Sequence, residues 1–187
     1  MNKHFNVLAV TFVVVAISTL IYCGNTNAKE NIEAQGNVPW VRNSLHGVSF
    51  ETPEKIIEQE SKIPEGYEEL IMKQKTYLLK QKSLIVFFMF MDTKFVTYDK
   101  KVGLNGAIGN MVNVMRGTDL TLDYQDPDNQ LDDLKCSGTF KFKNSGINVK
   151  GYVYWNKKGK TIILTTFGDT ADLSTMDKIF DSLRIAI

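Results

Sequence analysis

The stretch that decides the fold is residues 134–167, LKCSGTFKFKNSGINVKGYVYWNKKGKTIILTTF. Short apolar segments rich in β-branched and aromatic residues predict three strands here, at about 134–143, 147–155 and 161–167. The connections at 143–146 and 156–159 are short and contain glycine, as hairpin loops do. Strands that follow one another through hairpins run antiparallel, so this stretch predicts an antiparallel sheet.

Other segments are predicted to be strands as well. Alternation of apolar and polar residues predicts strands at 47–51, 67–80 and 120–124, and residues 55–59 fit a short strand or a helical turn. The run LIVFFMFM at 84–91 is apolar at every position. A strand of this kind is buried on both faces, which predicts that it lies at the centre of the sheet.

Two segments carry the spacing of amphipathic helices. Residues 102–116 have an apolar stripe, and glycines at spacing three would let that helix approach a sheet closely. A second stripe ends the chain, where Ser174-Thr175-Met176-Asp177 fits a capping box. Its apolar residues are Leu173, Met176, Ile179, Phe180 and Leu183. We therefore expect an α+β fold in one domain, 40–187, with helices covering an antiparallel sheet, preceded by a flexible lead-in at 29–39.

The first 28 residues predict export. Lys3 precedes an apolar run that ends in small and polar residues, and Thr26 and Ala28 fit a signal peptidase site with cleavage between Ala28 and Lys29. Two alternatives stay open, namely an uncleaved N-terminal anchor and lipidation at Cys23. The predicted location is secreted or periplasmic, or membrane-anchored and facing outside the cytoplasm if either alternative holds.

Charge and cysteine content exclude several classes. Cleavage would remove only Lys3 among charged residues, which leaves 21 basic and 21 acidic residues. This balance, with only three arginines in the chain, argues against nucleic acid as a partner. Cys136 would be the single remaining cysteine, so an internal disulfide cannot form. The domain would have to depend on its hydrophobic core.

No motif predicts a cofactor or a metal. Glycines 103, 106 and 109 lack the spacing of a phosphate loop. Asp126, Asp128 and Asp132 resemble the start of a calcium loop but lack its glycine and final glutamate, so cation binding there stays open beside a solvated turn. A cysteine hydrolase using Cys136 and His46 is an alternative that requires the fold to bring the two residues together.

Pairs of lysines on predicted strands suggest a contact surface. If these strands adjoin, their ammonium groups form a basic patch for an acidic partner or a lipid surface, whereas a solvated face is the alternative. Two tyrosines could belong to this surface or to the core. The candidate contact residues are Lys73, Lys75, Lys141, Lys143, Tyr152 and Tyr154.

Three segments resemble the PsbP-like family. The opening Gly47-Val48-Ser49-Phe50-Glu51-Thr52-Pro53, with Trp40 upstream, is similar to that family's Gly-hydrophobic-Ser-Phe-x-x-Pro start. The hairpin at 151–164 and the ending Ile179-Phe180-Asp181-Ser182-Leu183 fit it as well, whereas 55–69 departs from the family's simplest form. The resemblance implies an antiparallel sheet between helices and a non-enzymatic accessory role. We therefore expect an exported, non-catalytic protein that binds a protein or envelope component, with no functional residue transferred from the family.

Overall fold

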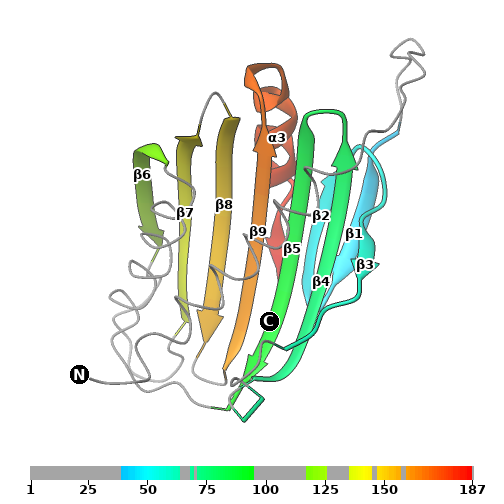
Figure 1. The fold of residues 1–187 in the computed structure, drawn as a ribbon, viewed down its shortest axis with the longest axis vertical. Helices are drawn as coiled ribbons and strands as arrows, with labels where there is room; N and C mark the ends of the chain where they lie inside the picture. Colours follow the sequence, from blue (N-terminus) through cyan, green and yellow to red (C-terminus); the bar gives the residue numbers. More distant parts are fainter. Residues whose placement is uncertain are drawn as a thin grey trace.

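In the computed structural model the described residues are 39–63, 68–69, 71–94, 117–125, 135–144, 147–156 and 159–186, and they form two antiparallel sheets and one α-helix (Figure 1). The large sheet has the order β3-β4-β5-β9-β8-β7-β6 and the small sheet the order β1-β2-β10. The large sheet comprises β3 (Ile57–Gln59), β4 (Ile71–Gln81), β5 (Leu84–Thr93), β6 (Thr118–Gln125), β7 (Lys135–Asn144), β8 (Ile147–Asn156) and β9 (Lys160–Gly168). The small sheet comprises β1 (Val41–Leu45), β2 (Val48–Thr52) and β10 (Arg184–Ile185), and the helix is α3 (Leu173–Asp181).

The predicted hairpin region is confirmed. Strands β7, β8 and β9 pair antiparallel in chain order, and β5 joins them by pairing with β9. Residues Val86 to Met91 of β5 are all buried, as the uninterrupted apolar run predicts. The mainly antiparallel α+β class is therefore correct.

Of the helices expected to cover the sheet, the described residues include α3, and a small sheet that the sequence did not predict covers the same face. Strands β1, β2 and β10 pack with α3 against one face of β4, β5 and β9, and Phe50 of β2 stacks on Phe88 of β5 with ring centroids 5.5 Å apart. Strand β1 reads VRNSL and β10 has two residues, so neither carries a readable alternation. Both depend on pairing with β2.

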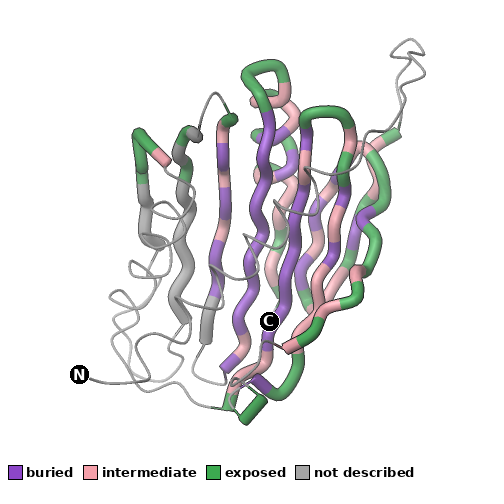
Figure 2. The backbone as a smooth tube through the Cα atoms, in the orientation of Figure 1, coloured by how far each residue is buried: buried purple, intermediate pink, exposed green. Residues whose placement is uncertain are grey.

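Register decides which residues share the covered face, which we call the layered face. Directly paired residues of neighbouring strands point to the same side of a sheet. Tyr77, Phe88, Leu164 and Tyr152 form one such row across four strands. Core residues of the opposite face are also buried, including Phe87, Met89 and Ile163, so the central strands are buried on both sides (Figure 2). The predicted helix at 102–116 lies outside the described residues.

The end of the chain forms the predicted helix with a different start. The capping box joins Asp169 and Asp172 across the short 3₁₀ turn η1 (Thr170–Asp172), and Ser174 lies inside α3. The sequence prediction of a box at Ser174 is therefore wrong, because the 3₁₀ turn moves the cap upstream. At the other end, the Ser182 hydroxyl accepts a hydrogen bond from the Glu51 N–H at 2.8 Å and donates to the Ile179 carbonyl at 2.7 Å. Ser182 thus fastens α3 to β2.

Among the described residues, no helix has the length and apolar character needed to span a membrane. The predicted signal segment, with Cys23, Ala28 and Lys29, lies outside them.

Candidate functional site

The first candidate is built around His46, which occupies the turn between β1 and β2. Leu45 pairs with Val48, so His46 and Gly47 form a two-residue hairpin loop, and both have left-handed backbones with φ of 50° and 80°. Such loops need positive φ at both positions, and histidine tolerates that region better than most residues. The turn therefore projects the imidazole onto the large sheet.

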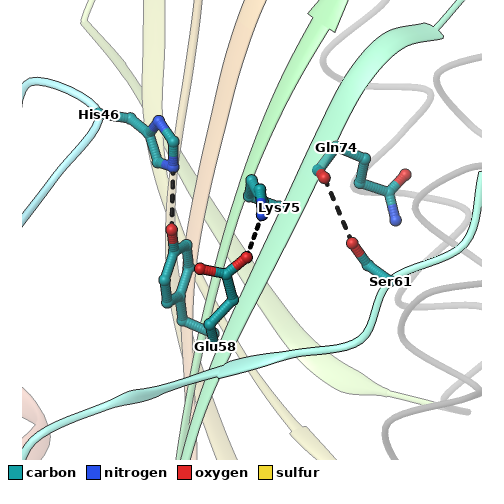
Figure 3. A network of polar contacts seen from close by, with 6 residues as sticks. His46, Glu58, Ser61, Gln74 and Lys75 are labelled. Atoms are coloured by element: carbon teal, nitrogen blue, oxygen red, sulfur yellow. Dashed lines mark hydrogen bonds and ion pairs between the residues drawn. The ribbon is translucent and has the colours of Figure 1, made fainter.

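Contacts on the large sheet hold the imidazole in place (Figure 3). The His46 Nε2 atom lies 3.1 Å from the Tyr77 hydroxyl. The His46 ring also stacks on Phe90, with centroids 4.2 Å apart and planes 9° apart. Glu58 of β3 forms an ion pair with Lys75 of β4 beside them. These residues form one polar cluster where the small sheet meets the large one.

Burial and neighbouring lysines set the ionisation of this cluster. Burial, and next the Lys73 charge, lower the pKa of His46, so the imidazole is neutral at pH 7. Burial raises the pKa of Tyr77. The hydrogen bond from Lys75 lowers the pKa of Glu58, and the bond to Glu58 raises the pKa of Lys75. The four side chains interact with one another, so the cluster forms a polar contact that joins the small sheet to the large sheet.

The structure does not bring Cys136 and His46 together. Phe90, on which His46 stacks, belongs to β5, whereas Cys136 lies on β7, three strands further along the sheet. Three strand spacings amount to about 14 Å. In the register, Cys136 also falls in the row of Met91 and Thr161, next to the row of Phe90. The pairing needed for a cysteine nucleophile and its base is therefore not present.

The acidic residues give no metal site in the described part of the chain. Asp126, Asp128 and Asp132 fall outside the described residues. Among the residues that are described, no group of three or more His, Cys, Asp or Glu side chains is arranged to hold a metal ion.

The six predicted contact residues do not form one surface. All six belong to the layered face by register, but β5, β9 and β8 separate Lys73 and Lys75 on β4 from Lys141 and Lys143 on β7. The condition that these strands adjoin is therefore not met. Tyr154 is 5% exposed and belongs to the core, and Tyr152 is half-buried against it. Packing of the small sheet and α3 on this face explains why the tyrosines are covered.

The second candidate lies near the hairpin that joins the end of β7 to the start of β8. It consists of three lysines, which we call the lysine cluster: Lys141, Lys143 and Lys150. Lys141 and Lys150 are directly paired across the strands, and Lys143 follows on the same face. Lys141 and Lys143 are exposed, whereas Lys150 is half-buried and forms an ion pair with Asp177 of α3. Burial and then the charge of Lys141 lower the pKa of Lys150, while Asp181 opposes them. The cluster is thus a site of partly uncompensated positive charge.

Threonine, aspartate and leucine residues of β6 adjoin the lysine cluster. On β6, Thr118 pairs with Lys143 and Thr121 pairs with Lys141, and both threonines are exposed. Asp119, which is exposed and has φ of 57°, and Leu120, which is 43% exposed, lie in the irregularity between those two pairs. On the flank of the cluster away from β6, α3 packs on the sheet. The molecular surface therefore drops from the helix to the sheet where the lysines lie, and we call this drop the step.

Sequence reasoning missed Lys150, although a signal for it exists. A two-residue loop at 145–146 pairs Asn144 with Ile147, and counting back along both strands places Lys150 opposite Lys141. The sequence prediction gives a hairpin connection at 143–146 but not its register. The Asp177 contact had no such signal, because α3 follows β9 in the chain and reaches β8 only in space.

Comparisons with known proteins add no assignment. The sequence matches no protein-family model and no curated protein. Among solved structures, a Pseudomonas aeruginosa protein of unknown function, described as a putative regulator, is 12% identical. The match covers 76% of this chain and 91% of that chain with a TM-score of 0.36. A TM-score this low gives no ground for transferring a fold or a function.

Proposed function

We propose that the protein is an exported, non-catalytic accessory protein that binds an acidic segment of a partner protein through the lysine cluster. The observation that carries the proposal is the direct pairing of Lys141 with Lys150, with Lys143 beside them. Like charges directly opposite one another destabilise a sheet. Departures of this kind from favourable pairing are expected at functional sites.

Carboxylates of a partner would relieve this repulsion. The charges of Asp177 and Asp181 on α3 attract the Lys150 ammonium group. Lys141 and Lys143, further from α3, are exposed and available to carboxylates of a partner. Lysine offers a mobile point charge rather than a planar fork, so it suits carboxylates presented in more than one geometry. The binding would be salt-dependent and moderate in strength.

The shape of the step favours a chain segment over a lipid surface. A helix packed on a sheet raises the surface by about 10 Å. A planar membrane resting on α3 would therefore be held away from the lysines, whereas an extended peptide can lie beside the helix. An anionic membrane is thus the alternative that the experiment below has to separate.

Export and the finer fold belong to the same proposal. The signal-like composition of residues 1–28 supports export, with Cys23 lipidation or a retained N-terminal helix as membrane-tethered alternatives. The PsbP-like sandwich is supported by the way its sequence motifs meet. Ser182 of the closing motif bonds Glu51 of the opening motif, and the Ala186 N–H donates to the Gly47 carbonyl at 2.8 Å. An accessory role is the function that this resemblance implies.

Binding of an acidic peptide tests the proposal directly. A fluorescent twelve-residue glutamate peptide is titrated with the purified protein, and affinity is measured by anisotropy at low and moderate salt. We expect Lys141→Gln/Lys143→Gln to weaken binding about fivefold to tenfold, since each exposed charge pair contributes a few tenths to 1 kcal/mol.

The matched control is Lys55→Gln/Lys62→Gln, which removes two exposed lysines elsewhere and should leave affinity unchanged. Equal weakening by both variants would reduce the effect to net charge and overturn the proposal. Vesicles of 30% phosphatidylglycerol in phosphatidylcholine form the second arm. Cluster-dependent binding to vesicles without binding to the peptide would assign the surface to a membrane instead.

A further inference from the structure

We draw no further inference here: the strongest candidate, the row on the large-sheet face opposite the layered face where the buried oxygen atoms Gln74 Oε1 and Thr161 Oγ1 have no hydrogen-bond partner, carries none, because nothing in the described part of the chain shows what covers that face.

Discussion

A few residues with positive φ lie where strands of this fold begin, end or turn. Among them, Gly159 has the least space for a side chain. Its φ is 80°, and a Cβ added there would lie 2.0 Å from the Thr93 carbonyl oxygen. The Gly159 carbonyl accepts hydrogen bonds from the Thr93 N–H at 3.0 Å and the Thr93 hydroxyl at 3.1 Å. Glycine is thus required both for the left-handed backbone and for the close approach that ties the start of β9 to the end of β5.

We predict that Gly159→Ala lowers the free energy of unfolding by about 3 kcal/mol or more, since it adds a backbone clash to conformational strain. Gly47→Ala is the comparison, because Gly47 also has φ of 80° but is exposed. It should cost only about 1–2 kcal/mol. Urea unfolding of both variants measures the difference, and equal losses would show that the contact with Thr93 contributes nothing.

His46 predicts how stability changes with pH. Its pKa is lowered in the folded protein, so the unfolded chain binds a proton first as pH falls through about 6.5. The stability that His46 contributes is therefore present above that pH and is lost below it. His46→Asn keeps a residue that accepts positive φ in the turn and removes the titrating group.

We expect the wild-type protein to lose more stability than His46→Asn between pH 7.5 and pH 5.5, measured by urea unfolding at each pH. Lys73, Glu58 and Lys75 are the charged groups that act on the imidazole, and the Tyr77 hydroxyl contacts it. A wild-type curve parallel to that of the variant would contradict a depressed pKa at His46.

At the scale of elements, the closing helix shows how a local signal can be displaced. The sequence Ser174-Thr175-Met176-Asp177 satisfies the capping pattern, yet the box forms at Asp169, whose carboxylate accepts a hydrogen bond from the Ala171 N–H at 2.7 Å. Asp172 completes the box by accepting from the Asp169 N–H at 3.1 Å. The 3₁₀ turn between them extends the helix upstream of the pattern that the sequence suggested.

We predict that Asp169→Ala lowers the free energy of unfolding by about 1 kcal/mol, because the substitution removes the N-cap side chain. Ser174→Ala should change it by no more than about 0.5 kcal/mol, because Ser174 is an exposed residue inside the helix. Thermal unfolding followed by circular dichroism compares the two variants. A larger loss of unfolding free energy for Ser174→Ala than for Asp169→Ala would show that the cap lies at Ser174, as the sequence predicted.

For the whole molecule, the arrangement in two layers explains where binding chemistry can lie. The small sheet and α3 occupy the part of the layered face over β4, β5 and β9, and ring contacts such as Phe50 on Phe88 join the layers. Beyond α3, the same face continues along β8 and β7, where Lys141 and Lys143 of β7 are exposed. The step between the two regions therefore arises because the small sheet and α3 cover only part of the large sheet.

Export predicts a defined start of the mature chain. Intact mass spectrometry of the protein recovered from outside the cytoplasm should show a chain beginning at Lys29, because the small residues at Thr26 and Ala28 fit signal peptidase. A chain beginning with lipidated Cys23, or with Met1 intact, would replace release by tethering. A cytoplasmic protein with an intact N-terminus would contradict export altogether.

The sequence by itself determined the closing helix and the strands of the large sheet other than β3, because local periodicity and hairpin loops act over neighbouring residues. For β3 it left a helical turn open. It did not reveal β1 and β10, which are held by pairing with β2, nor the upstream cap at Asp169. Only the tertiary structure decided that Lys73 and Lys75 lie apart from Lys141 and Lys143, that Tyr154 is core, and that Asp177 meets Lys150. These depend on strand order and on which part of a face is covered, and contacts between residues distant in the chain decide both.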